Sequence, residues 1–227
     1  MHLYETHLHT SPVSKCAIAD VAEVVNFYKD LGYAGIFITN HFLDGNINID
    51  RELPYEERIN FYFSDYERAK ALGDKIGLDV FFGAELSYKG TDFLVYGLDK
   101  EWYLAHPEIM RMSKTEELTL MANDGALIIQ AHPFREAAYI DHIRLYPRHV
   151  HGVEIYNANR SEFENGMARH YAKSYSLLHF AGTDNHRGKA QTKLCGVRFS
   201  SKIQSELDFV NRIRNGEHKT FKKEISE

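Results

Sequence analysis

The chain has 227 residues, of which 44% are hydrophobic, so it can bury a core of its own and we expect a single domain over residues 1–227. The formal net charge of −5 argues against a general affinity for nucleic acid. The apolar runs are strand-sized and fall short of the ~18 residues that a membrane span needs, which argues against a membrane partner.

Cysteine is scarce in this chain. Only Cys16 and Cys195 are present, and the first residues lack the basic start and apolar run of a signal peptide. We therefore expect a cytoplasmic protein without disulfides. The sequence gives no indication of its oligomeric state.

Short apolar runs alternate with helical patterns from end to end. In chain order we expect a helix over 19–31, a strand over 35–39, an irregular loop over 43–54, a helix starting at Ser64, strands over 80–84 and 93–96, a helix starting at Ser113, strands over 126–129 and 152–156, a helix starting at Ser161, a strand over 178–181 and a helix over 206–215. Each of the three serines precedes a glutamate by three residues, which is the capping-box spacing. The strands are uniformly apolar, which favours buried parallel strands covered by helices. The alternation predicts an α/β fold, either a barrel or a doubly wound sheet.

Two pairs of residues with metal-binding side chains have a spacing of two. His7 and His9 form one pair near the start, and Asp184 and His186 form the other near the end. On an extended strand, side chains at i and i+2 point to the same face, so each pair directs two ligands at one spot. This spacing predicts a metal site.

Three more residues of the same kind follow apolar runs. They are His41, Glu85 and His132. The carboxyl ends of the strands in a closed parallel barrel meet on one face, so these residues should join the two pairs there. A lone histidine among 13 is more often a surface or core residue, so we base the prediction on the joint pattern. Because one ion takes about four protein ligands, seven candidates predict two or three ions.

Six motifs in this order resemble the PHP (polymerase and histidinol phosphatase) family, and the resemblance covers the whole chain. The motifs are His7-Leu8-His9-Thr10, Thr39-Asn40-His41, Gly83-Ala84-Glu85, Ala131-His132-Pro133, Val153-Glu154-Ile155-Tyr156-Asn157 and Gly182-Thr183-Asp184-Asn185-His186. The resemblance implies a distorted (β/α)7 TIM-like barrel that binds two or three divalent ions (Zn, Mn or Fe) and hydrolyses phosphoesters.

The resemblance also implies roles for single residues. The first ion would be held by His7, His9, Glu85 and Asp184. Glu85 would bridge to a second ion that also takes His132, while His41 and His186 would hold a third. Glu85, Asp184 and His186 would be the catalytic residues, around a metal-bound hydroxide that attacks phosphorus in line.

The chain departs from the family pattern at two positions. Many members have a histidine or aspartate six residues after the second histidine of the first motif, where this chain has Lys15; it either contacts substrate phosphate or points to solvent. Cys16 could ligate as a thiolate, although a small core thiol is the simpler interpretation. The histidine that relatives offer to the second ion after Glu85 is missing; Asp92 is the nearby candidate, against a role in a turn, and His106 is the fallback.

Other residues are expected around the ions. Glu5 shares a face with His7 and is a candidate to orient a ligand histidine, or else is a surface acid. Glu154 and Asn157 are expected at the barrel mouth, where they would support the metal ligands without binding an ion themselves. Three arginines could clamp phosphate with their planar forks or be solvated loop cations: Arg135, Arg160 and Arg187.

We therefore expect a metal-dependent phosphoesterase that acts on a small phosphorylated substrate, with a phosphomonoester favoured. One alternative is a non-catalytic module that binds metal or phosphate, and it is kept open by the two departures from the family pattern. The other is an amidohydrolase-like metal hydrolase, which the chain length and the Asp184/His186 pair disfavour.

Overall fold

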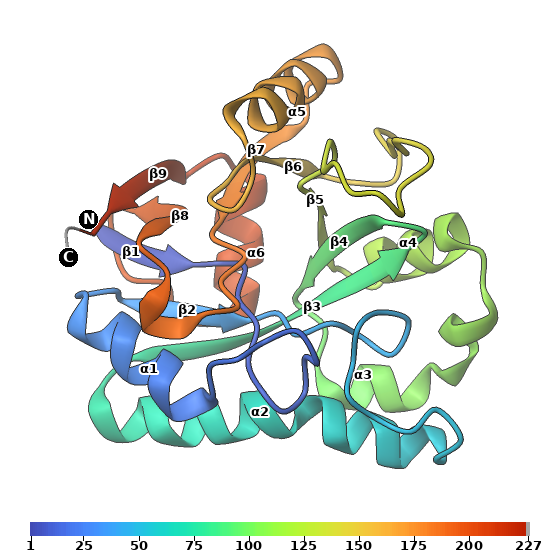
Figure 1. The fold of residues 1–227 in the computed structure, drawn as a ribbon, viewed down its shortest axis with the longest axis horizontal. Coiled ribbons are helices and arrows are strands. Elements are labelled where there is room, and N and C mark those ends of the chain that lie inside the picture. Colours follow the sequence, from blue (N-terminus) through green and yellow to red (C-terminus); the bar gives the residue numbers. More distant parts are fainter. Residues whose placement is uncertain (226–227) are drawn as a thin grey trace.

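The computed structural model describes residues 1–225 as a curved sheet with helices packed around it (Figure 1). The strands are β1 (His2–Glu5), β2 (Gly35–Ile38), β3 (Asp79–Tyr88), β4 (Thr91–Tyr96), β5 (Leu127–Ala131), β6 (Gly152–Asn157), β7 (Leu178–Gly182), β8 (Lys193–Phe199) and β9 (Lys219–Glu224). The helices are α1 (Val21–Asp30), α2 (Tyr55–Ile76), α3 (Lys100–Ala105), α4 (Lys114–Asn123), α5 (Glu162–Ser174) and α6 (Glu206–Arg214), with 3-10 turns η1 (Pro107–Arg111) and η2 (Gly188–Ala190). No helix within residues 1–225 is long and apolar enough to cross a membrane.

The strands form one sheet that nearly closes on itself. Their order is β7-β6-β5-β4-β3-β2-β1-β8-β9 across the described residues. The two halves are joined again on the far side by a parallel bridge between Leu8, just after β1, and Asn185, just after β7. The architecture is a distorted TIM-like barrel, as the sequence predicted, and the carboxyl ends of the parallel strands meet at one mouth.

The prediction of parallel strands throughout was wrong for the middle of the sheet. Strands β1, β2 and β3 are mutually parallel, as are β5, β6 and β7, but β4 runs antiparallel to both of its neighbours. The cause is the two-residue turn Lys89-Gly90, whose φ angles are 49° and 82°. Positive φ at both central residues is the geometry that reverses a strand in a tight hairpin. Strand β8 is also antiparallel to β1.

Each α-helix except α2 begins at a residue whose side chain caps it. The capping boxes at Ser113 and Ser161 are confirmed, and each starts a helix. The helix start at Ser64 was wrong, because this residue lies in the middle of α2. That helix begins nine residues earlier, directly after Pro54, since its first turns already bury Ile59 and Tyr62. Proline fits a helix start because its missing N–H would be unpaired there.

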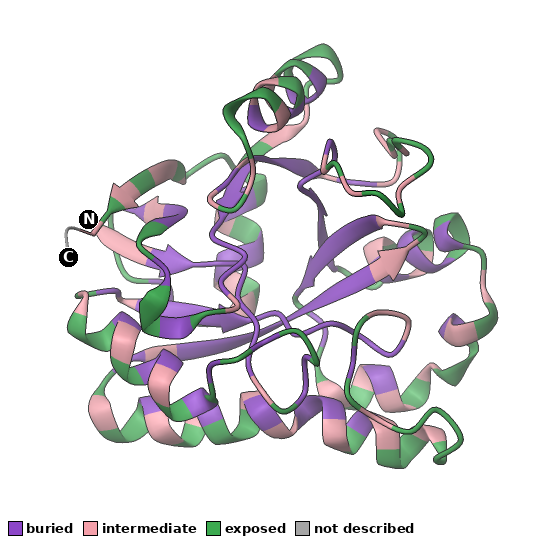
Figure 2. Ribbon diagram, in the orientation of Figure 1, coloured by how far each residue is buried: buried purple, intermediate pink, exposed green. Residues whose placement is uncertain are grey.

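The pattern of burial matches a sheet that is covered by helices. Figure 2 shows most strand residues buried, except along β9, and the helices buried only on their inner faces. Inside the barrel, α6 inserts Phe209 among the rings of Phe37, Tyr96 and Phe180, at centroid distances of 4.2, 5.3 and 6.3 Å. The Tyr96 hydroxyl donates to the carbonyl of Thr6 at 2.6 Å. An aromatic core thus supports the segment that carries the first histidine pair.

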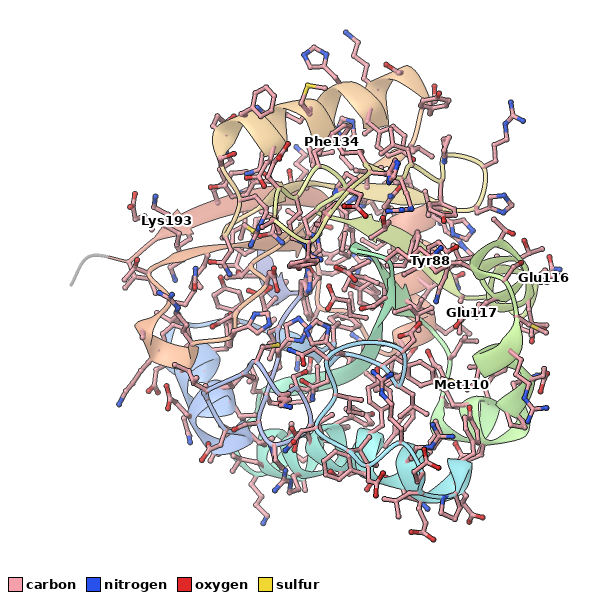
Figure 3. The ribbon with its side chains drawn as sticks, turned by 45° about the vertical axis from the view of Figure 1, so that its right-hand side comes forward. Tyr88, Met110, Glu116, Glu117, Phe134 and Lys193 are labelled. Carbon is pink, nitrogen blue, oxygen red and sulfur yellow. The ribbon has the colours of Figure 1, made fainter. Side chains whose placement is uncertain are left out.

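The remaining helices pack on the outside. Figure 3 shows Phe134 beneath α5 and Lys193 at the start of β8, the strand next to the edge strand β9. Phe134 belongs to a small apolar cluster with Ile155 and Tyr171, which attaches α5 to β6. The loop predicted over 43–54 is irregular in the structure and lies beside the barrel mouth.

Candidate metal centre

The two residue pairs lie side by side at the seam of the barrel. They flank the bridged residues: His7 and His9 on either side of Leu8, Asp184 and His186 on either side of Asn185. The Asp184 amide donates to the His7 carbonyl at 2.7 Å, and the His9 amide donates to the Asn185 carbonyl at 2.9 Å. The rings of His9 and His186 stack at 4.1 Å. The pairs follow β1 and β7 rather than lying on them, and the isolated bridge between Leu8 and Asn185 keeps the two pairs side by side.

Glu85 lies at the centre of the cluster. Its carboxylate oxygens are 3.1 Å from His7 Nε2, 3.4 Å from His9 Nε2, 2.6 Å from His41 Nδ1 and 3.3 Å from His132 Nε2. The sequence predicted Glu85 at the end of a strand, which was wrong. Strand β3 continues for three residues beyond Glu85, so this residue lies inside the strand. A parallel bridge to His41 fixes it next to the end of β2.

Asp184 supplies the second carboxylate. Its Oδ1 lies 3.5 Å from His7 Nε2, 3.4 Å from His9 Nε2 and 3.3 Å from His186 Nδ1. The backbone of Asp184 has φ +60°, a left-handed conformation that aspartate tolerates better than most residues. The sharp turn there directs the carboxylate back into the barrel.

Several atoms of the cluster are buried without a hydrogen-bond partner of good geometry. They include His7 Nε2, His9 Nε2 and Glu85 Oε2. An unpartnered buried polar atom costs about 1–3 kcal/mol, so an arrangement of several is unfavourable unless a ligand satisfies them. Among the described residues, three groups have ligand atoms close enough to hold an ion: His7/Glu85/His132, His7/His9/Asp184 and His9/His41/His186. These donor atoms suit divalent metal ions.

The electrostatics favour ionised carboxylates at the centre. Burial opposes charge on Glu85, but His41 and His7 outweigh it and hold the pKa of this carboxyl well below its usual value. The pKa of Asp184 is also lowered, because His7 and His9 outweigh its burial. Burial, with the neighbouring His186 and His41, lowers the pKa of His9, which keeps that ring neutral and able to donate a lone pair.

Two buried glutamates hold the ligand segments from behind. Glu154 Oε1 accepts from His7 Nδ1 at 2.8 Å, and its Oε2 accepts from the His132 amide at 3.0 Å. Glu154 and Asn157 are both fully buried and joined by a 3.0 Å hydrogen bond, so they support the histidines from behind, as expected, but do not line the mouth. They lie beneath the site.

Glu5 acts on the backbone rather than on a histidine ring. One of its oxygens accepts the amides of His7 and Thr183 at 3.0 and 2.9 Å, and the other accepts the Tyr28 hydroxyl at 2.9 Å. It is fully buried, which excludes the surface interpretation. Burial raises the pKa of Glu5 to about 7, while the hydrogen bonds from Thr183 oppose that shift.

A cavity of about 710 Å³ opens over the cluster. Its lining includes the three predicted arginines, Arg135, Arg160 and Arg187, together with Lys89, which the sequence analysis did not single out. The guanidinium of Arg135 lies 2.9 Å from Asp92 Oδ2. The basic side chains thus lie in the same cavity as the acidic residues Asp44, Glu85, Asp92 and Asp184.

Three of the uncertain residues are now placed. Lys15 is exposed and does not line the cavity, whereas Cys16 does, with Sγ 3.2 Å from His41 Nε2. Cys16 is therefore not a core thiol. His106 stacks on Trp102 and contacts Glu108, outside the cavity lining, so it is not the missing ligand. In the sequence, the only indication that Cys16 faces the site was that it follows Lys15, which occupies the position of a histidine or aspartate in many PHP proteins.

No protein-family model and no curated protein matches the sequence. Solved structures do match. A two-domain protein from Bacteroides vulgatus that contains a predicted PHP-like metal-dependent phosphoesterase is 13% identical, with a TM-score of 0.68 over 97% of this chain and 64% of its own. The chain thus spans less than two thirds of that relative.

Two further structures are similar. PsfC from Pseudomonas syringae is 15% identical, with a TM-score of 0.62 over 99% of this chain and 92% of its own. An amidohydrolase from Chromobacterium violaceum, with bound sulfate and no metal, is 12% identical, with a TM-score of 0.50 over 83% and 89%. At such low identity these similarities concern the fold. The chain has the fold of PHP-like structures, as its motifs predicted.

Proposed function

We propose that the protein is a metal-dependent phosphoesterase of the PHP family that hydrolyses a small phosphorylated substrate, with a phosphomonoester as the expected class. One observation carries the proposal: a single buried carboxylate, Glu85, lies within 3.4 Å of ring nitrogens from four histidines. A purely structural core has no use for that many imidazoles around one acid. A carboxylate in this position can bridge two cations.

The three groups of ligand atoms match the ion sites that the motifs imply. The first ion would take His7, His9, Glu85 and Asp184. The second would share Glu85 and take His132, and the third would take His41 and His186. Divalent ions in such sites lower the pKa of a bound water and neutralise phosphate charge, which is the chemistry that phosphoester hydrolysis needs. Zn, Mn and Fe all suit the mixed nitrogen and oxygen ligands.

The cavity suits an anionic substrate. Arg135 is held in place at one side of the mouth, because its guanidinium contacts Asp92 and donates to the Gly90 carbonyl at 3.3 Å. A guanidinium fork matches the geometry of phosphate oxygens. Arg160 and Arg187 line the same cavity, and Lys89 adds a fourth cation. We assign these side chains to phosphate binding and orientation.

The two alternative functions lead to different expectations. An amidohydrolase is suggested by the name of one structural neighbour, and it would act on amides with the same ions. A non-catalytic binding module would take up metal and phosphate without turnover. The position of Glu85 between the ion sites, and an open cavity above it, favour catalysis over binding alone.

A reconstitution experiment tests the proposal. Full-length protein is stripped with a chelator and reloaded with Mn, Fe or Zn. Bound metal is then measured by elemental analysis. The reloaded protein is assayed for phosphate release from an aryl phosphate and a panel of phosphomonoesters, and for cleavage of a panel of amides. We expect metal-dependent phosphate release. Amide cleavage alone would identify an amidohydrolase, and tightly bound metal without any turnover would identify a binding module.

A further inference from the structure

A thiol completes the third group of ligand atoms. The nitrogens of His9, His41 and His186 lie within 4.8 Å of one another, and Cys16 faces this group from the cavity wall. Its Sγ is 3.2 Å from His41 Nε2, and His186 lines the same cavity. Cys16 is therefore part of a cluster with the histidines and not an isolated surface cysteine.

The Nδ1 atoms of His41 and His186 are both directed at acidic residues. His41 Nδ1 is turned to Glu85 Oε2 at 2.6 Å, and His186 Nδ1 faces the carbonyl and carboxylate of Asp184 at 3.0 and 3.3 Å. The Asp184 carbonyl accepts from His186 Nδ1, which keeps the proton on that atom and leaves the His186 Nε2 lone pair for a metal. His41 Nε2 is the ring nitrogen that lies next to the sulfur, at 3.2 Å.

The backbone holds Cys16 in this position from both sides. The Lys15 amide donates to the Asn46 carbonyl at 2.9 Å, and the Ile18 amide donates to the His186 carbonyl at 2.9 Å. The segment is thus tied to the loop over 43–54 and to the pair-bearing turn after β7. In this arrangement the side chain of Lys15 points outward and that of Cys16 points into the cavity.

We propose that Cys16 is a ligand of the third ion, together with His41 and His186. On binding, the S–H bond breaks, the proton passes to solvent and the sulfur lone pair forms the bond to the metal, with no change of oxidation state. Two neutral imidazoles supply no charge, so the thiolate provides the negative charge at this site. A sulfur and two nitrogen ligands favour zinc or cobalt over manganese, because thiolates are soft. The inference rests on the proposed function and specifies one of its ion sites.

Cobalt substitution tests the ligand directly. Metal-free full-length protein is titrated with Co²⁺, and the near-ultraviolet absorption that a thiolate gives when bound to cobalt is recorded. We expect this band in the wild type and its loss in Cys16→Ser. The variant should also bind cobalt at least about tenfold more weakly at one site, because losing even a residue that only orients a ligand lowers metal affinity by that factor. Cys195→Ala is the matched control, because that thiol is fully buried away from the cavity and the band should persist.

A second measurement needs no variant. Cys16 is exposed, so an alkylating reagent should modify it in the metal-free wild type, and stoichiometric zinc should slow this reaction at least about tenfold. Absence of the cobalt band, its persistence in Cys16→Ser, or equal alkylation with and without zinc would each overturn the inference. Phosphate release is assayed separately: turnover without the band leaves the proposed function intact, and the band without turnover refutes only that function.

Discussion

The Nδ1 atom of His7 donates to Glu154 Oε1 at 2.8 Å, and both side chains are fully buried. A carboxylate only accepts hydrogen bonds, so the pair fixes the His7 proton on Nδ1. The opposite nitrogen, Nε2, then faces Glu85 and Asp184 with its lone pair available. Glu154 therefore determines which atom of His7 can serve as a ligand, and it also anchors the backbone of His132.

Glu154→Gln should weaken metal binding without unfolding the protein. The amide keeps the size of the side chain but loses the charge that orients His7, and losing such a partner lowers metal affinity about 10- to 100-fold. Competition with a fluorescent chelator would measure the change. Glu116→Gln, an exposed acid on α4, is the control and should bind metal as the wild type does. Equal affinities in both variants would show that Glu154 has no such role.

Asp184→Asn should abolish turnover and leave the fold intact. Asparagine tolerates the left-handed backbone that alanine would strain, so the change mainly removes the negative charge that faces His7 and His9. His9→Ala should have the same effect through the loss of a ring ligand. We expect phosphate release to fall at least about a hundredfold, with far-ultraviolet circular dichroism unchanged. Activity near the wild-type level would contradict the assigned ion site.

Asp92→Asn should change substrate binding more than metal content. In the structure Asp92 contacts Arg135 at 2.9 Å and lies 4.0 Å from His132 Nε2, so we assign it to positioning the guanidinium. The variant should raise KM about tenfold with kcat changed little, because phosphate orientation is lost while the ions remain. Arg135→Lys should show the same pattern, since lysine lacks the planar fork. Loss of one bound ion in Asp92→Asn would instead identify it as a ligand.

The metal-free protein should lose stability below about pH 6.5, partly through His151. Its Nδ1 accepts the Ile128 amide at 3.1 Å, and burial, with a contribution from Arg214, lowers the pKa of the ring from its usual 6.5. The unfolded chain then binds a proton that the folded protein does not, so stability falls as the pH drops through this range. A protonated ring also cannot accept that hydrogen bond, which costs about 1 kcal/mol.

His151→Gln keeps an acceptor that does not titrate. The free energy of unfolding is measured with urea for both proteins, in the presence of a chelator, at pH 7 and at pH 5. The decrease from pH 7 to pH 5 should be smaller by about 1 kcal/mol in the variant than in the wild type. The ligand histidines titrate in both proteins, so their contribution cancels in the comparison. An equal decrease in both proteins would show that His151 does not contribute to the pH dependence of stability.

The sequence predicted that these side chains would cluster, because their positions follow local rules. His41, His132 and Asp184 each lie within a few residues after an apolar run, and the carboxyl ends of parallel strands in a barrel meet at one mouth. The orientation of β4 was missed because the Lys89-Gly90 turn is a weak signal and its strand is as apolar as a parallel one. The helix start at Ser64 was misplaced since a good capping spacing also occurs by chance inside a long helix.

Other features depended on contacts that no local pattern contains. Strand β9, Lys219–Glu224, is rich in lysine and lies at the sheet edge, so it lacks the apolar signal of a buried strand. The buried positions of Glu154 and Asn157 follow from how β6 packs between its neighbours. That Cys16 and not Lys15 enters the cavity depends on two backbone hydrogen bonds to distant segments.

The bridge between Leu8 and Asn185 joins segments that are nearly the whole chain apart. During synthesis, the first ligand pair leaves the ribosome long before the second exists, so no high-affinity site can form until β7 has docked against the start of the barrel. Metal uptake would then follow barrel closure and not guide it. Once bound, the ions would connect the two sides of the seam, and opening the barrel there would require their release.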